Sequence, residues 1–293
     1  MARDVSLFKG TTGLNDKVDS VRVKPEELTS AVNVDIDRTG RISRRNGFAS
    51  VLAKGSHSIF PCGNYCLFVS GTDLCVLNPD YSWSAIRTVT QGARMDYYKL
   101  GSAVYYLNGH ERGIVIDRVH TAWNALAYVG PATTRTFSDP PIGTLLDLYN
   151  GRMFITEEDV EWYSEPFAYA WFDLARNFVP LPGRLVMKRA VKSGIFISTE
   201  DEQFFLGGGT PDEMTITKIA EYPAIAGTVV RVNFSRIGDG SVAGIGLIWA
   251  STKGICLGSP NGEFRNVSQN KINFAGGAVG AGLHRDGKYI VSF

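Results

Sequence analysis

The stretch GRMFITEEDVEWYSE (residues 151–165) and the stretch SGIFISTEDEQFFLGG (residues 193–208) share one plan. Each has a short apolar strand, a polar turn and a second apolar strand, which is the pattern of a β-hairpin. Aliphatic and aromatic residues favour strands with one or both faces buried, and the acidic turn interrupts the apolar run. The two stretches therefore predict consecutive hairpins of a repeating unit.

The same plan recurs along the whole chain. Further instances are NYCLFVSGTDLCVLN from Asn64, SAVYYLNGHERGIVID from Ser102, GIGLIWASTKGICLGS from Gly244 and a half-unit, GKYIVSF, from Gly287. The first strands recur at a mean spacing of about 45 residues, which is typical of a four-stranded propeller blade. Weaker outer strands follow in several units, as at 214–220 and 263–268, and no long window has helical periodicity. We therefore expect an all-β fold, a single β-propeller of five or six blades.

The two ends of the sequence suggest how such a ring closes. Hairpins are expected near residues 64–78, 102–117, 151–165, 193–208, 245–259 and 287–293, and the last is only half a unit. Residues 31–36 and 41–43 flank a turn and offer the missing strands, because an unpaired edge is an aggregation hazard. We expect 31–43 to pair with 288–293, within a propeller domain of residues 25–293 that follows an extended N-terminal arm of residues 1–24.

Composition excludes several classes of protein. The 293 residues are 44% hydrophobic, so a disordered chain is excluded, and 30 basic against 29 acidic residues exclude a histone-like DNA-coating protein. No apolar run is long enough for a transmembrane helix, and the N-terminus lacks the apolar core of a secretory signal. The four cysteines, without zinc-type spacing, are expected to be free thiols in a reducing compartment.

Candidate chemical motifs favour structural interpretations. Asp35, Asp37 and Gly40 resemble the start of a calcium loop, but their flanks are strands, so a hairpin turn is expected. An acidic run could be a glycosidase pair, yet a solvated turn is the simpler interpretation. Its members are Glu157, Glu158, Asp159, Glu161 and Glu165. Without a nucleotide-binding or hydrolase motif, we expect no catalytic residue, no metal site and no cofactor.

A compact basic cluster lies in the N-terminal hairpin. Its members are Arg38, Arg41, Arg44 and Arg45. Such a cluster can contact nucleic acid phosphates or acidic neighbours, and in a nearly neutral chain a contact between subunits is favoured over general DNA binding. Apolar residues of the preceding arm, including Phe8 and Leu14, are expected to order on a neighbouring subunit, so assembly contacts are predicted at Phe8, Leu14, Arg41, Arg44 and Arg45.

The N-terminal motifs GLNDKVDSVRV (13–23) and ELTSAVNVDIDRTGRISRRNGF (27–48) resemble the opening of bacteriophage virion proteins of the tail nozzle or tail hub type. NGRMFITEEDVEWYSEPF (150–167) and IWASTKGICLGSPNGEFRNVS (248–268) are similar as well. The resemblance implies a non-enzymatic structural protein of the tail, assembled in the host cytoplasm into a homo-oligomeric ring with sixfold symmetry at the DNA exit channel. Such a nozzle, hub or connector would retain and conduct the genome without sequence specificity, dock adaptor and fibre proteins, and not insert into a membrane.

A propeller that binds or degrades glycans is the alternative function. It would place aromatic platforms and two carboxylates at the mouth of a central tunnel. Candidate platforms are Trp83, Trp123, Trp162, Trp171 and Trp249, although tryptophans on such strands are more often core residues. A pocket where tryptophan and two carboxylates converge would favour this alternative.

Overall fold

In the computed structural model, strands and turns succeed one another along the described chain. The structure describes residues 10–19, 21–37, 39–47, 49–50, 54–131, 133–237, 242–272, 277 and 279–293. Within them the only helical segments are two single 3-10 turns, η1 (Pro211–Glu213) and η2 (Phe234–Arg236). The expected all-β fold is therefore confirmed. No helix in these ranges has the length and apolarity that a membrane crossing requires.

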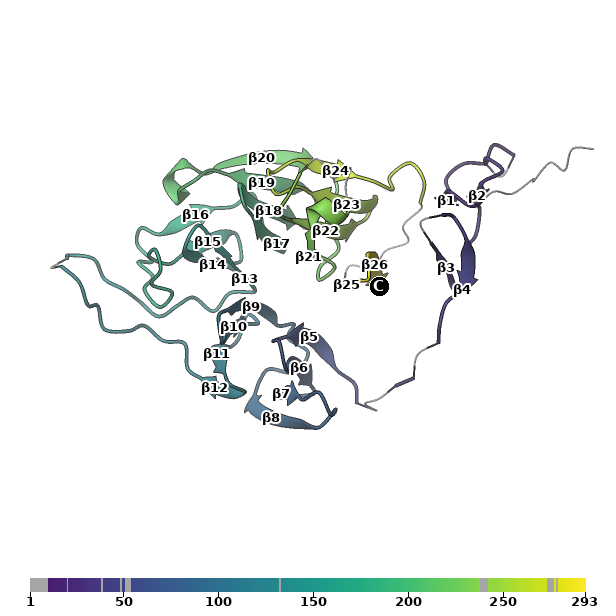
Figure 1. The fold of residues 1–293 in the computed structure, drawn as a ribbon. Helices are drawn as coiled ribbons and strands as arrows, with labels where there is room; N and C mark the ends of the chain where they lie inside the picture. Colours follow the sequence, from purple (N-terminus) through teal and green to yellow (C-terminus); the bar gives the residue numbers. More distant parts are fainter. Residues whose placement is uncertain are drawn as a thin grey trace, which may run out of the picture.

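Five four-stranded antiparallel sheets form the body of the molecule (Figure 1). In each sheet the strands follow chain order. The first two sheets are β5 (His57–Pro61), β6 (Cys66–Ser70), β7 (Asp73–Leu77), β8 (Trp83–Thr88), and β9 (Asp96–Leu100), β10 (Ala103–Leu107), β11 (Arg112–Ile116), β12 (Val119–Thr121). The third is β13 (Leu145–Tyr149), β14 (Arg152–Glu157), β15 (Val160–Tyr163), β16 (Phe178–Pro180). The fourth and fifth are β17 (Leu185–Val191), β18 (Gly194–Thr199), β19 (Gln203–Gly207), β20 (Thr215–Ala220), and β21 (Val230–Asn233), β22 (Ile245–Ser251), β23 (Gly254–Gly258), β24 (Phe264–Asn266).

The sheets follow one another around a common centre, in a propeller-like arrangement (Figure 1). The first strand of each sheet lies nearest that centre, and β13 contacts both β9 and β17 there. These inner strands precede the apolar hairpins found in the sequence, which form the second and third strands of each sheet, such as β14–β15 and β18–β19. The weaker segments at 214–220 and 263–268 contain the outer strands β20 and β24.

Apolar side chains fill the spaces between successive sheets. Leu67 and Val76 of the first sheet pack with Val104 and Tyr106 of the second. Three equivalent clusters join the second sheet to the third, the third to the fourth and the fourth to the fifth. Both faces of the central strands are therefore buried, which explains their nearly continuous apolar sequences. In β18, every residue from Gly194 to Thr199 is buried.

The two ends of the described chain form separate two-stranded sheets. Strand β26 (Lys288–Ser292) pairs with β25 (Ala281–Arg285), and β3 (Val34–Ile36) pairs with β4 (Ile42–Arg44). Sequence analysis expected the half-unit at 288–293 to pair with residues 31–43, but in the described ranges β26 pairs with β25 and no backbone ladder joins it to β3 or β4. The two hairpins meet through an ion pair, with Lys288 Nζ 3.1 Å from Asp35 Oδ2.

The turn between β3 and β4 is organised by one carboxylate. Asp37 Oδ1 accepts hydrogen bonds from the backbone N–H groups of Thr39 and Arg41, at 2.8 and 3.0 Å, and from the Thr39 hydroxyl. These bonds lower the pKa of Asp37 below its usual value, with the Thr39 hydroxyl as the largest cause. The Asp-rich segment is thus a hairpin turn, as its strand flanks predicted.

The described part of the N-terminal arm folds back on its own chain. Strand β1 (Gly13–Leu14) pairs in parallel with β2 (Glu27–Leu28). The Thr11 N–H donates to Gly40 O at 2.8 Å, and the Asp16 N–H donates to Lys271 O at 2.9 Å. Residues 11–16 therefore lie against the β3–β4 hairpin and the segment that follows β24.

Candidate functional site

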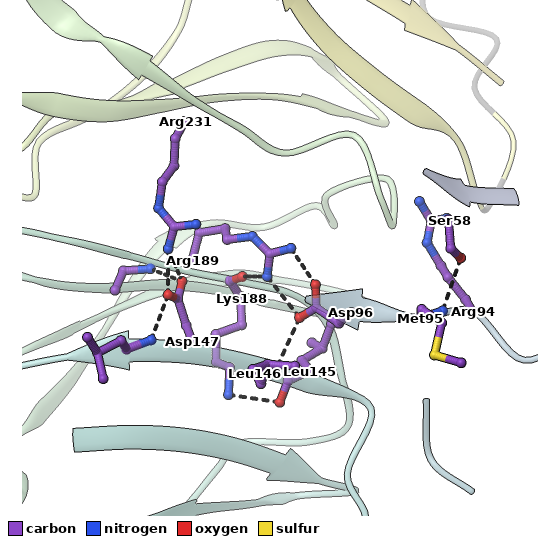
Figure 2. Close-up of polar contacts among 12 residues, drawn as sticks. Ser58, Arg94, Met95, Asp96, Leu145, Leu146, Asp147, Lys188, Arg189 and Arg231 are labelled. Atoms are coloured by element: carbon purple, nitrogen blue, oxygen red, sulfur yellow. Dashed lines mark hydrogen bonds and ion pairs between the residues drawn. The ribbon is translucent and has the colours of Figure 1, made fainter. Parts of the chain in front are cut away.

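A cluster of charged residues lies among the inner strands (Figure 2). We call it the inner-strand ionic cluster, and its members are Asp96 of β9, Asp147 of β13, Glu161 of β15, Lys188 and Arg189 of β17, and Arg231 of β21. Buried charges are costly unless each is paired and hydrogen-bonded, so such a concentration needs an explanation.

Asp96 and Arg189 form a two-pronged ion pair between the second and fourth sheets. Arg189 Nη1 and Nη2 lie 2.9 and 2.5 Å from the two carboxylate oxygens of Asp96. Asp96 Oδ2 also accepts the Leu146 N–H of β13 at 2.9 Å. Burial lowers the pKa of Arg189, but the Asp96 carboxylate outweighs burial and raises it overall. One carboxylate thus connects three sheets.

Asp147 of β13 links the third, fourth and fifth sheets in the same way. Its side chain is fully buried, and both carboxylate oxygens lie 2.5 Å from Arg231 Nη2. Its Oδ2 accepts the Ala190 N–H of β17 at 2.8 Å, and its Oδ1 accepts the Leu148 N–H at 2.7 Å. Charge-assisted bonds of this kind are stronger than neutral ones, which helps to offset the cost of burying the carboxylate.

Lys188 and Glu161 form a pair that is wholly removed from solvent. Lys188 Nζ donates to Glu161 Oε1 at 2.5 Å and to the carbonyls of Leu145 and Phe154 at 3.1 and 3.0 Å. Glu161 Oε2 accepts the Thr156 hydroxyl at 2.6 Å. Burial raises the pKa of Glu161 and lowers that of Lys188, while their mutual attraction opposes both shifts. Three acceptors satisfy the three donors of the ammonium group.

The solvated-turn interpretation of the acidic run is wrong for Glu161. Glu157, Glu158 and Asp159 are exposed, as a turn requires, but Glu161 lies in β15 on the same buried face as Tyr163. Alternate residues of a strand share a face, so position 161 falls on the core side, where Lys188 supplies the opposite charge. Glu165 is also paired, since it contacts Arg135.

Arg94 joins the segment before the second sheet to the segments before β21 and β25. It precedes β9, and its guanidinium donates to Gly280 O at 3.0 Å and to Ala226 O at 3.4 Å. Gly227, with φ +79°, leaves the space that the guanidinium occupies, because a Cβ at that position would overlap it. This contact brings together segments that precede β9, β21 and β25.

The pairing pattern decides what the inner-strand ionic cluster can do. Asp96, Asp147 and Glu161 each contact a cation and accept further hydrogen bonds, so their oxygens are occupied in holding sheets together. Across the described ranges, no group of three His, Cys, Asp or Glu side chains could hold a metal ion. The arrangement fits a rigid scaffold better than an acid–base pair facing a substrate.

The tryptophan platforms expected for a glycan enzyme are dispersed. Trp249 and Trp123 are core residues, 0% and 2% exposed, while Trp83 is 39% exposed on an outer strand. Trp171 lies near Glu165 and Asp173, but both carboxylates contact Arg135, Asp173 at 2.8 Å. One cavity between the third and fourth sheets is lined by neither tryptophan nor carboxylate.

Four of the five predicted assembly residues lie in the described ranges, and Phe8 lies outside them, as does Arg38 of the basic cluster. Leu14 is half-buried where β1 pairs with β2. Arg41, Arg44 and Arg45 are exposed on the β3–β4 hairpin, and Arg45 lies 3.7 Å from Asp35. The structure therefore gathers Leu14 and the three arginines in one N-terminal region, and their role in assembly stays a prediction.

Sequence analysis missed the inner-strand ionic cluster. A signal was present, because single charges interrupt otherwise apolar strands, as Asp147 does in LLDLY and as Lys188 and Arg189 do in LVMKRAV. A charged residue inside a strand buried on both faces indicates a paired charge.

Comparisons with known proteins found little that bears on function. No family model and no curated protein matches the chain. Among solved structures, the extracellular domain of BT4673 from B. thetaiotaomicron is 12% identical over 74% of this chain and 28% of its own, with a TM-score of 0.47. A chain of the S. cerevisiae complex of Dbp5 with Nup159 and Gle1 is 8% identical over 78% of this chain and 68% of its own, with a TM-score of 0.47. AztD from Citrobacter koseri is 11% identical over 76% and 62%, with a TM-score of 0.42. Likenesses this weak carry no argument about this chain.

Proposed function

We propose that the protein is a structural component of a bacteriophage tail, whose copies form a ring, hexameric in the simplest case, at the DNA exit channel. The observation that carries the proposal is the inner-strand ionic cluster, in which each carboxylate links side chains or backbone of different sheets. A part that retains and conducts a genome under load needs such a rigid frame, and it needs no cofactor. The motifs of residues 13–23 and 27–48 supply the link to tail proteins.

The ring of sheets closes, in this proposal, when the β3–β4 hairpin completes the sheet of β25 and β26. Two strands from each end of the chain would make a sixth sheet of four strands, equal to the other five. The contact between Lys288 and Asp35 supports this pairing, as does the bridge from Arg94 to Gly280. A closed, six-bladed propeller would leave β26 without a free edge.

The N-terminal region is the proposed contact between copies and with adaptor or fibre proteins. Arg41, Arg44 and Arg45 are exposed there, and Val21 and Val32 are 89% and 81% exposed. Exposed cations beside exposed apolar side chains suit a protein surface with acidic and apolar patches. Phage DNA would pass through the assembled channel without sequence recognition, in a virion assembled in the host cytoplasm.

Native mass spectrometry and negative-stain imaging of the full chain test this proposal. Wild-type protein is expected to form rings of one stoichiometry, and a variant with Arg41→Glu, Arg44→Glu and Arg45→Glu is expected to remain folded and monomeric. Arg285→Glu is the matched control, because Arg285 is an exposed arginine of the other terminal hairpin. Rings that persist in the triple variant would exclude these arginines as assembly contacts. A wild-type protein that stays monomeric at all concentrations and is absent from purified virions would overturn the proposed function.

A further inference from the structure

A cavity of about 200 Å³ lies between the third and fourth sheets. Its wall includes Tyr149 of β13, Asn150 of the following turn, Arg152 of β14, Pro166 from the β15–β16 connection, and Thr210 from the β19–β20 connection. The tail function does not use this cavity. Its lining combines aromatic rings and prolines with a few polar groups, as small-molecule sites do.

An exposed aromatic residue stands beside the cavity. Phe167 follows Pro166, is 79% exposed and has a φ of +57°, which is unfavourable for a bulky side chain. The Phe167 N–H donates to Gly151 O at 2.6 Å, and the Phe167 ring lies against Gly151. In the sequence, Gly151 stands between Asn150 and Arg152, which both line the cavity. A Cβ at position 151 would come within 2.8 Å of the ring. A strained backbone that carries an exposed aromatic side chain beside a cavity motivates the hypothesis of a ligand contact there.

The polar groups of the cavity keep unused hydrogen-bonding capacity. Across the described residues, Arg152 makes one hydrogen bond, from Nη1 to Ser164 O at 2.9 Å, which leaves other guanidinium N–H groups available. Asn150 donates its amide to Gly209 O, which leaves its side-chain oxygen available as an acceptor. Thr210 precedes η1 without capping it through its hydroxyl. The cavity thus offers donors and an acceptor, and two of the residues that carry them, Asn150 and Arg152, flank in sequence the glycine that the Phe167 ring covers.

Charge near the cavity narrows the class of ligand. Asp212 and Glu213 follow Thr210 and Pro211 directly, and Asp212 and Arg152 both lie close enough to Tyr163 to shift its pKa, in opposite directions, so negative charge lies near the single guanidinium. Their negative charge opposes a phosphate or a nucleic acid backbone. A pyranose ring fits instead, because it pairs an apolar C–H face with hydroxyl groups that both donate and accept hydrogen bonds.

We propose that Phe167 and the adjoining cavity form a binding subsite for one pyranose ring of a glycan. The C–H face of the sugar stacks on Phe167, and its hydroxyls bind Arg152, Asn150 and Thr210. The proposal includes no chemical step, and it does not depend on the tail function.

Binding is tested with the full chain on a glycan array, followed by saturation-transfer NMR with the monosaccharides of any glycan that binds. Wild-type protein is expected to bind at least one glycan with a millimolar or tighter Kd. Phe167→Ala and Arg152→Gln are each expected to weaken binding by about tenfold or more, which corresponds to losing one stacking or charged hydrogen-bonding contact. Phe167→Gly, which also accepts the positive φ, separates loss of the ring from any backbone rearrangement.

Phe178→Ala is the matched control. Phe178 belongs to β16 of the same sheet, is 46% exposed and packs on Trp162 rather than on the cavity. The control is expected to bind like the wild type. The subsite is refuted if no glycan or monosaccharide binds, if Phe167→Ala and Phe178→Ala bind equally well, or if single-stranded oligothymidine binds Phe167 in place of sugars. None of these outcomes bears on ring formation, so the two proposals fail separately.

Discussion

Replacing Lys188 by methionine tests whether the inner-strand ionic cluster holds the sheets together. The substitution keeps an unbranched side chain but removes the ammonium that binds Glu161 and the carbonyls of Leu145 and Phe154. Both charged side chains are fully buried, and breaking such a pair from one side costs about 3–5 kcal/mol of unfolding free energy. A loss of that size corresponds to a decrease of roughly 10 °C in Tm.

Urea denaturation and calorimetry of the purified protein measure this loss. Lys218→Met is the matched control, because Lys218 makes an ion pair with Glu202 at 3.0 Å on an exposed strand. It is expected to lose little or no stability, since exposed pairs are screened by solvent. The double variant Lys188→Met with Glu161→Leu is expected to recover most of the loss, because no unpaired charge then remains in the core.

The pH dependence of the Lys188→Met variant provides an independent check. Burial raises the pKa of Glu161, and without Lys188 nothing charged opposes that effect. A carboxyl whose pKa is higher in the folded than in the unfolded protein stabilises most below its ordinary value of 4.5, and that contribution is lost as pH rises. The gap in stability between wild type and variant should therefore widen from pH 5 to pH 8. The reasoning fails if Lys188→Met is no less stable than Lys218→Met, or if the gap does not change with pH.

Three other perturbations have defined outcomes. Deleting Tyr289–Phe293 removes all of β26 except Lys288, together with the hydrogen bond from the Tyr289 hydroxyl to Thr228 O. The Tm measured by calorimetry should therefore fall clearly, and an unchanged Tm would contradict a structural role for this strand. Arg231→Gln should cost more than Asp147→Asn in urea denaturation, about 3 against 1–2 kcal/mol, because it leaves the fully buried Asp147 carboxylate without its cation. Asp147→Asn leaves only a guanidinium that solvent can reach, and the reverse order would be inconsistent with the network. Burial raises the pKa of Cys62 and Cys256 to about 11, so both thiols stay protonated at pH 8. They should therefore react with iodoacetamide far more slowly in folded than in urea-unfolded protein, as mass spectrometry of the labelled peptides would show. Equal rates would contradict their burial.

The repeated hairpins were predictable because their information is local. In 151–165 and 193–208, apolar residues and polar turns lie within a few positions of their pairing partners, so the sequence alone predicts the middle strands of each sheet. The inner strands were harder to predict, because charges such as Lys188 interrupt their apolar pattern and resemble solvent-facing positions. Burial of those charges depends on partners in other sheets.

The partners of the inner-strand ionic cluster were beyond sequence reasoning for a related reason. Asp96 and Arg189 are 93 residues apart, and Asp147 and Arg231 are 84 apart. Nothing in the local pattern matches one such residue with another, since the match depends on which sheets become neighbours. Glu161 shows the result, because its acidic neighbours made it look like part of a solvated turn.

The division of the molecule into sheets made from contiguous segments has a consequence for how it forms during synthesis. Each four-stranded sheet needs only residues close together in the chain, so its hairpins have low contact order and can form soon after they leave the ribosome. The bonds of Asp96 and Asp147 must wait until Arg189 and Arg231 have been translated. Strand β26 appears after all the other described strands, so the apolar surfaces and the sheet edge that it covers stay unprotected until it has been translated. This interval is when nascent chains of this protein are most prone to aggregate.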